Sequence, residues 1–245
     1  MKIETNETKT DIAQIEKMFE VGAHYAYSRS KRHASTKPFI FGVKNGTEIF
    51  DLEKTAISLE EAKNFAKTVF ENAGKQMLFV ASKNEAKDIV KSIAESVGMP
   101  SVHNRWVGGT LTNFDVIKKR VSRYLKLLEE KESGELLKYT KKERLQIDKE
   151  IAKLERKFAG IVSMKTLPAV LFVVDSKYEA VAVQEALLKN IPVIALANSD
   201  CNIREIDFPI VANDASCDSI KFFTEEIASL CKNKIIEDSP VLVKK

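Results

Sequence analysis

The sequence predicts an α/β fold. We expect a mainly parallel sheet of the flavodoxin-like or Rossmann-like kind, helices on both of its faces, and an inserted antiparallel coiled-coil α-hairpin. Short apolar runs of strand length alternate with amphipathic segments of helix length, which is the pattern of a parallel sheet buried on both faces. One highly charged segment near the middle of the chain interrupts this alternation with two heptad repeats, which indicate two helices that pack along a seam.

The N-terminal fifty residues contain a helix, a basic loop and a strand hairpin. An amphipathic helix is expected over residues 11–21, and Gly22 ends it. After the basic loop, a strand is expected over 38–43. Asn45-Gly46 is a strong signal for a tight hairpin turn, which leads the chain into a second strand at 48–50.

Apolar runs and capping motifs place the remaining elements of the sheet. Ser58-Leu59-Glu60-Glu61 and Ser82-Lys83-Asn84-Glu85 have the capping-box pattern, and they predict two helices that end at Gly74 and Gly98. Further strands are expected at 76–81, 101–102, 169–174, 192–197 and 209–211. Further helices are expected at 178–189 and 216–232.

The charged middle segment predicts a helical hairpin that projects from the globular part. Its first seam comprises Phe114, Ile117, Val121, Tyr124 and Leu128. Its second seam comprises Ile147, Ile151, Leu154 and Phe158. A turn at Glu132-Ser133-Gly134-Glu135 joins the two arms, and each arm is roughly 25–30 Å long at a rise of about 1.5 Å per residue. We therefore expect residues 1–112 and 159–235 to form one α/β domain, 113–158 a basic coiled-coil insertion, and 236–245 a flexible tail.

Positive charge is concentrated in two places. Residues 116–157 contain 14 Lys or Arg and eight Asp or Glu, a net charge of +6, although the whole chain carries only +4. The segment between Glu20 and Glu48 contains five basic residues and no acidic one. Localised positive charge of this kind is typical of a polyanion-binding protein, although two solvated faces would produce the same pattern.

The composition is that of a folded chain in a reducing compartment. Of 245 residues, 44% are hydrophobic and 30% are charged, which excludes a disordered chain. Cys201, Cys217 and Cys231 are widely spaced, which argues against a disulfide framework and a zinc knuckle. The N-terminus is polar, and no apolar run approaches the roughly 18 residues that span a bilayer. We expect a cytoplasmic protein without a membrane partner.

A doubly wound sheet raises the alternative of a nucleotide- or phosphate-binding enzyme with a helical appendage. The glycine-rich fingerprints of dinucleotide and nucleoside triphosphate sites are absent from the sequence. No Gly-x-Ser-x-Gly motif provides a serine nucleophile. His24 and His33 lie in or beside the basic loop, and His103 and Asp175 are more typical of packing and helix capping than of catalysis. We therefore predict no catalytic residue, no metal site and no cofactor.

The segment from Arg105 to Thr110 is the nearest approach to a phosphate-binding loop. Its two glycines, Gly108 and Gly109, would let backbone amides approach an anion. The alternative is a tight turn at the root of the hairpin, with Trp106 as a packed structural anchor and the two glycines permitting close packing. We favour the packed turn over a site for a small-molecule phosphate. Contact of this loop with a ribose–phosphate backbone stays open at the level of the sequence.

Several of these segments resemble the bacterial small-subunit ribosomal protein two family. The likeness extends over about residues 12–230, and the block from Arg105 to Asn113 is the most specific part of it. The other blocks are Gly22–His24, Lys37–Gly42, Leu52–Thr55, Leu167-Pro168 leading into Asp175, Glu185-Ala186 and Ile191–Val193. This family also carries a basic hairpin at the corresponding place. The chain departs from the family pattern at Tyr25–Ser28, at Arg32–Thr36 and at Asn198–Ile203, where a proline is missing.

The resemblance implies a structural constituent of the small ribosomal subunit that binds its RNA and neighbouring ribosomal proteins. The large, mRNA-binding ribosomal protein one is a possible partner, and the family has no catalytic residues to carry over. The RNA-binding candidates in the loop and beside the glycines are Arg29, Lys31, Arg32, His33, Lys37 and Arg105. Those on the hairpin are Lys118, Lys119, Arg120 and Arg123.

Overall fold

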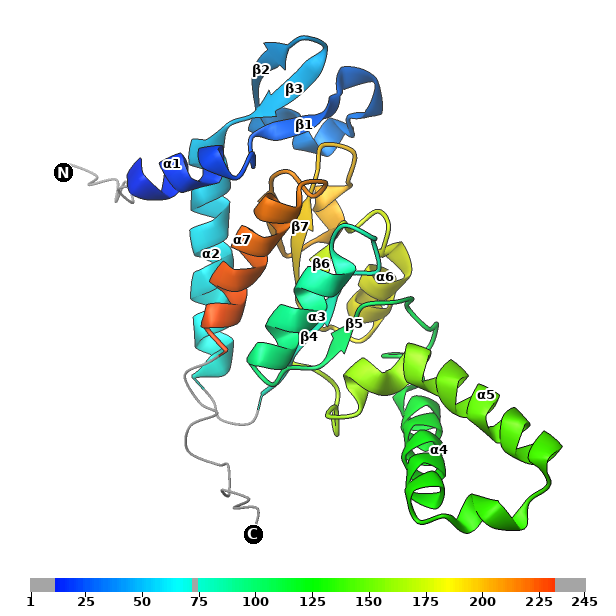
Figure 1. The fold of residues 1–245 in the computed structure, drawn as a ribbon. Coiled ribbons are helices and arrows are strands. Elements are labelled where there is room, and N and C mark those ends of the chain that lie inside the picture. The colour runs from blue at the N-terminus through cyan, green and yellow to red at the C-terminus, as the bar shows by residue number, and fades with distance from the viewer. Residues whose placement is uncertain (1–11, 72–74, 232–245) are drawn as a thin grey trace.

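The computed structural model describes residues 12–71 and 75–231, and its centre is a five-stranded parallel sheet (Figure 1). The strands are β4 (Met77–Val80), β5 (Ser101–Val102), β6 (Val170–Val174), β7 (Val193–Ala197) and β8 (Phe208–Val211). Their order in the sheet is β5-β4-β6-β7-β8. This is the flavodoxin-like order, in which the topology reverses between the first and third strands, here β4 and β6. The predicted fold class is confirmed.

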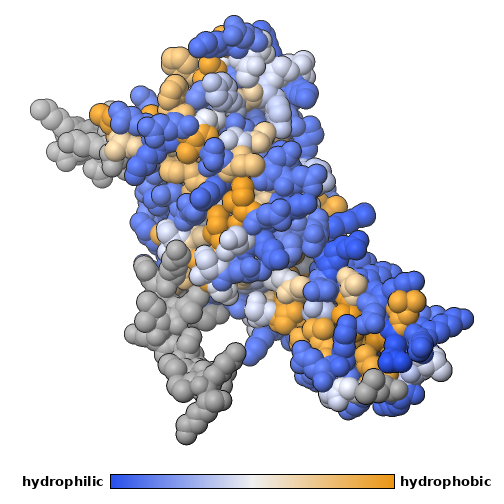
Figure 2. Space-filling model, in the orientation of Figure 1, coloured by the Kyte–Doolittle hydropathy of each residue, from blue (hydrophilic) through white to orange (hydrophobic). Residues whose placement is uncertain are grey.

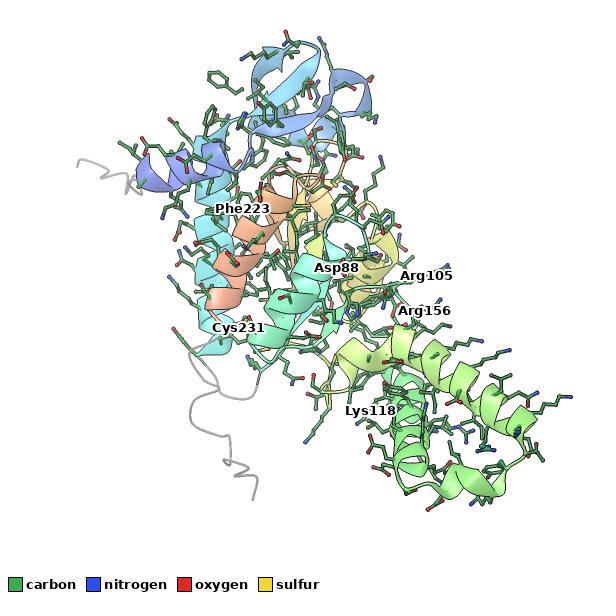
Figure 3. All side chains as sticks on the ribbon, in the orientation of Figure 1. Asp88, Arg105, Lys118, Arg156, Phe223 and Cys231 are labelled. Carbon is green, nitrogen blue, oxygen red and sulfur yellow. The ribbon has the colours of Figure 1, made fainter. Side chains whose placement is uncertain are left out.

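Helices cover both faces of the sheet, because successive strand residues point to opposite sides. Met77 and Phe79 of β4 belong to one hydrophobic core, whereas Leu78 and Val80 belong to another. The first core is covered by α2 (Leu52–Phe70), α3 (Lys87–Ser96) and α7 (Cys217–Ser229). Figure 3 labels Phe223, a fully buried side chain of α7 in this layer. The second core is covered by α6 (Ala180–Leu188) and by the hairpin.

The hairpin consists of α4 (Phe114–Glu132) and α5 (Lys141–Phe158), and its far end projects from the sheet (Figure 1). Most predicted seam residues are buried or half-buried, and Leu127, which was not predicted, is buried with them. These side chains are continuous with the second core. The link between the arms runs from 133 to 140, longer than the predicted turn, and includes η3 (Glu135–Lys138). Thr140 and Glu143 form a capping box that begins α5.

A small antiparallel sheet lies at the other end of the molecule (Figure 1). It contains β1 (Tyr25–Ser28), β2 (Ile40–Lys44) and β3 (Thr47–Phe50), in the order β1-β3-β2. Asn45 and Gly46 both have positive φ, 53° and 79°, so the predicted tight turn is confirmed. The predicted strand at 38–43 begins two residues late, because η1 (Arg29–Lys31) and η2 (Ala34–Phe39) fill the loop before it.

Two predicted helix starts were wrong. Helix α2 begins at Leu52, where the Asp51 side chain accepts a hydrogen bond from the Glu53 amide (3.2 Å), and Ser58 lies inside the helix. Ser82 does not cap α3, since its amide and hydroxyl both donate to the carboxylate of Glu179. Asp51 therefore caps α2 in place of Ser58, and Glu179 takes the hydrogen bonds that Ser82 would have used in a capping box. The predicted helix end at Gly74 lies outside the described residues.

Helix α1 (Ile12–Glu20) presents part of its apolar face to solvent. Met18 is buried in the first core, whereas the side chains of Ile12 and Phe19 are 73% and 62% exposed. The helix ends before Gly22, which has a φ of 71°. The apolar face predicted for this helix is therefore only partly covered by the chain itself.

The fold generates one prediction at Gly160, in the short helix η4 (Ala159–Ile161) that follows α5. A Cβ atom at this position would lie 2.1 Å from the carbonyl oxygen of Ser101 in β5. Gly160→Ala should lower the free energy of unfolding by about 1–3 kcal/mol, because backbone would have to move to relieve the overlap. Gly42 is the matched control, since a Cβ there meets no atom within 4 Å. Urea unfolding compares the two variants, and equal stability would contradict this close approach.

Candidate nucleic-acid interface

The loop between β1 and β2 forms the first basic surface. Arg29, Lys31 and Lys37 are exposed on it. The ammonium of Lys31 lies 5.2 Å from the centroid of the Tyr27 ring, a cation–π distance that leaves the charge accessible to solvent. The three cations are accessible to solvent, and their contact with RNA stays a prediction.

Arg32 differs from its neighbours in the same loop. Its guanidinium Nη1 donates to Oε1 of Glu48 at 2.6 Å, and the side chain is only 19% exposed. Glu48 lies in β3 and is fully buried, so Arg32 provides the positive charge that compensates an interior carboxylate. Arg32 was expected among the exposed RNA contacts. The structure assigns its charge instead to holding the loop against the small sheet.

His33 and His24 also serve the packing of this region. The amide of His33 donates to the carbonyl of Ser199 (2.8 Å), and its Nδ1 accepts from the amide of Ser35 (3.3 Å). His24 is buried and stacks on Phe19, with ring centroids 4.4 Å apart. Burial, with a smaller contribution from Lys44, lowers the pKa of His24 below its ordinary value. The ring of His24 is buried and His33 is half-buried, and contact of His33 with RNA stays a prediction.

The second basic surface follows the hairpin. Lys118, Lys119, Arg120 and Arg123 are all exposed on α4. Only Arg123 of these four forms an ion pair with a described residue, Glu150 of α5 at 3.4 Å. Hydrophilic side chains cover much of the hairpin in Figure 2, with apolar groups gathered between its arms, and Figure 3 labels Lys118 on α4. The seam therefore holds the arms together while most of the charge stays outside.

A single carboxylate organises the loop that leads into the hairpin. Glu185 of α6 accepts hydrogen bonds at Oε1 from the indole of Trp106 (3.0 Å) and the amide of Gly109 (2.7 Å). Its Oε2 accepts from the amides of Leu111 and Thr112 and from the hydroxyl of Thr112, each at 3.0 Å. The backbone amides that resembled an anion-binding loop therefore bind an anion, which is this internal side chain.

The hydrogen bonds decide the ionisation of Glu185. Burial alone would raise its pKa, but the bonds from Thr112, Trp106, Gly109 and Leu111 outweigh burial, and the pKa falls below its ordinary value. The carboxylate is thus charged at neutral pH and occupies the place that a phosphate would take. This role of Glu185 was not predicted from the sequence. The signals available were an acidic residue in a mostly apolar helix and the Glu185-Ala186 block of the family resemblance.

The two glycines of this loop differ in what the fold requires of them. Gly109 has a φ of 89°, and a Cβ there would lie 3.3 Å from Cβ of Asn113. Gly108 has no left-handed backbone, and a Cβ there would meet no atom within 4 Å.

Trp106, predicted as the anchor, is buried. Arg105 is exposed, and Figure 3 shows it near Arg156, between the sheet and the hairpin.

The carboxyl ends of the central strands, where α/β proteins usually bind ligands, contain a closed polar network. The ammonium of Lys83 lies 3.2 Å from Asp175 and 3.3 Å from Asp214. Asn198 donates to the second oxygen of Asp214 at 2.7 Å. Asp175 also accepts from the amides of Lys177 and Tyr178 in the turn after β6, so it does not cap the following helix as predicted, because α6 begins only at Ala180, after Glu179.

The charges of this network compensate one another. Burial, assisted by the nearby Asp175, raises the pKa of Asp214 to about 6, and the ammonium of Lys83 opposes that shift. For Lys83, burial disfavours the ammonium, but the two carboxylates outweigh burial and raise its pKa.

Within 12–71 and 75–231, no group of three His, Cys, Asp or Glu residues is placed to hold a metal ion. The same residues include no helix that is both long and apolar enough to cross a membrane.

Comparison with known proteins shows similarity to one family. The profile described as "Ribosomal protein S2" matches residues 18–233. The "Small ribosomal subunit protein uS2" of Flavobacterium johnsoniae is 40% identical over 224 residues, which cover 91% of this chain and 86% of that protein. Its namesake in Geotalea uraniireducens is 39% identical over 87% of this chain and 83% of that protein. The one in Coprothermobacter proteolyticus is 38% identical, over 89% and 81% respectively.

The first prediction from this site concerns Glu185. Glu185→Gln should lower the free energy of unfolding at neutral pH by about 1–3 kcal/mol, because an amide nitrogen cannot accept from the donors at one of the two oxygen positions. Since folding lowers the pKa of Glu185, this stability is present above the ordinary value of 4.5 and is lost as the pH falls through the folded-state pKa. The difference from wild type should therefore shrink in acid. Urea unfolding across this range measures it, with Glu225→Gln, at an exposed position of α7, as the control.

The second prediction separates Arg32 from Lys31. Arg32→Gln should cost about 1–3 kcal/mol of stability, because it leaves the Glu48 carboxylate buried without its cation. Lys31→Gln changes an exposed side chain and should alter stability by less than about 0.5 kcal/mol. Thermal melting of the two variants measures the difference. Equal melting temperatures would show that the ion pair contributes nothing to stability, and Arg32 would then be grouped with the exposed cations of the loop.

Proposed function

This chain belongs to the ribosomal protein S2 family and is a structural constituent of the small ribosomal subunit, and we propose that it binds the subunit RNA through two separate basic surfaces. The hairpin provides one surface, through Lys118, Lys119 and Arg120. The loop after β1 provides the other. Because the small sheet and the hairpin lie at opposite ends of the molecule (Figure 1), the chain would connect two RNA segments.

The observation that carries this proposal is the charge of the projecting hairpin. Residues 116–157 contain 14 basic and eight acidic residues. Arg123 and Lys131 of α4 form ion pairs with α5, whereas Lys118, Lys119 and Arg120 form none with a described residue. A projecting arm with unneutralised cations is suited to phosphate contacts, which contribute affinity without reading sequence. The loop supports the second contact, since Arg29, Lys31 and Lys37 are exposed and its backbone is tied to Ser199 through His33.

Neighbouring ribosomal proteins are the second class of partner that we propose. Phe19 of α1 and Phe41 of β2 are 62% and 81% exposed, and Val43 of β2, two residues after Phe41, is also exposed. Large apolar side chains that the chain leaves uncovered fit a protein partner at this end of the molecule. The large, mRNA-binding ribosomal protein one is a candidate for this place because the family resemblance implies it.

We also propose that the chain has no enzymatic activity. The loop that could have held a phosphate is filled by Glu185, and Lys83 occupies the space between Asp175 and Asp214 at the topological switch point of the sheet. The backbone amides of the glycine loop and the space between Asp175 and Asp214 are therefore both occupied by internal groups.

Truncating the hairpin tests the proposal. The root residues Ile117, Leu154 and Phe158 belong to the second core, so a deletion of the whole hairpin would expose apolar surface and confuse the result. Replacing only 122–150 with a short Gly/Ser linker, together with Lys118→Gln, Lys119→Gln and Arg120→Gln, keeps the root and removes the three proposed contacts. This variant should unfold cooperatively but should lose stable association with small subunits, because it lacks most of the projecting arm. Thermal melting and sucrose-gradient co-sedimentation are measured together, and full co-sedimentation of the folded variant would refute an RNA-binding role for the arm.

A further inference from the structure

Two surface hollows lie on either side of Gly108, which lines both of them. The first has a volume of about 530 Å³ and lies between α4 and α5 at the root of the hairpin. The second, of about 550 Å³, lies at the carboxyl ends of the central strands, between Arg105 and Tyr178. Each volume falls within the range of sites that hold a small organic group, roughly 300–1,000 Å³.

The first hollow is positively charged and has apolar walls. Arg120 of α4 lines it together with Lys153 and Lys157 of α5, and none of the three forms an ion pair with a described residue. Glu150 is the only acidic residue that lines the hollow, and its carboxylate is engaged by Arg123. Three cations that share a hollow repel one another, so the site is electrostatically complementary to phosphate.

The second hollow combines a cation with an aromatic ring. Arg105 is exposed, and Tyr178 is 63% exposed although it lies only four residues after the buried end of β6 at Val174. An exposed ring and a guanidinium that line one hollow are a combination with which proteins bind a nucleobase and its phosphate. The phenol ring has no role in the packing of either hydrophobic core.

Gly108 connects the two hollows. Its backbone does not need glycine, because φ is not left-handed and a Cβ would meet no atom within 4 Å. Its neighbour Gly109 has an internal reason to be glycine, and Gly108 has none. A glycine that the fold does not require leaves the backbone open to close approach by another molecule.

We propose that an unpaired stretch of RNA crosses the chain at Gly108 and places one nucleotide in each hollow. This inference rests on the proposed function and specifies which form of RNA the hairpin root binds. An A-form duplex presents a wide, shallow minor groove and a regular backbone, and it cannot insert single nucleotides into separate hollows. An acidic peptide would satisfy the cations but would leave the exposed face of Tyr178 unused.

The test measures binding of a labelled short oligouridylate to the full-length protein by fluorescence anisotropy as salt is varied. Gly108→Leu and Tyr178→Ala should each weaken binding by about tenfold, through obstruction of the crossing and loss of a stacking surface. Lys153→Gln with Lys157→Gln should lower the log–log salt slope by about 1.4, since each single-strand phosphate contributes about 0.7. The matched control is Lys142→Gln with Lys149→Gln, two exposed lysines of the same helix outside the hollow, and it should change neither quantity.

The outcomes separate this inference from the proposed function. If the control pair weakens binding as much as the Lys153 and Lys157 pair, or if Tyr178→Ala binds like wild type, the joined hollows are not the site. The inference also fails if an RNA duplex or an oligoglutamate peptide competes as well as unlabelled oligouridylate. In each of these cases, co-sedimentation of the wild-type chain and of the truncated variant would still decide the proposed function separately.

Discussion

The attachment of the hairpin to the sheet depends on one buried carboxylate. Glu185 is contributed by a helix of the α/β layer, and the groups that it binds belong to the loop that starts α4. Five hydrogen bonds from Trp106, Gly109, Leu111 and Thr112 fix that loop in one conformation. Because the bonds keep the carboxylate charged inside the protein, removing any one donor leaves the buried charge of Glu185 less well stabilised and lowers the stability of the fold. The direction in which the hairpin leaves the sheet follows from this arrangement.

The hairpin is therefore both an appendage and part of the core. Near its root, Ile117 and Phe158 pack with Leu78 and Leu171 of the central strands in the second core. Farther out, the arms have only each other, and charged residues face solvent on most sides. This division explains how an arm with a large positive charge can project without destabilising the sheet, since the apolar root and the charged tip lie on different stretches of the same two helices.

The positive charges of the molecule fall into two groups with different surroundings. Lys83 and Arg32 are enclosed and neutralise buried carboxylates, so they contribute to the structure. Lys31, Lys118 and Arg120 are exposed and have no ion pair with any described residue, so they remain able to bind phosphate. Sequence position does not distinguish the two groups, because Lys31 and Arg32 are adjacent.

The sequence by itself determined the alternation of strands and helices, the turn at Asn45-Gly46 and the charged hairpin, because period and turn chemistry are local properties of neighbouring residues. Only the tertiary structure decided which polar groups meet. Glu185 binds donors that are 73 to 79 residues away, and Ser82 binds Glu179 across 97 residues instead of capping its own helix. Such pairs depend on how the strands are ordered in the sheet, and no spacing along the chain encodes that order. The same long-range packing enclosed Arg32 and left Lys31 in solvent.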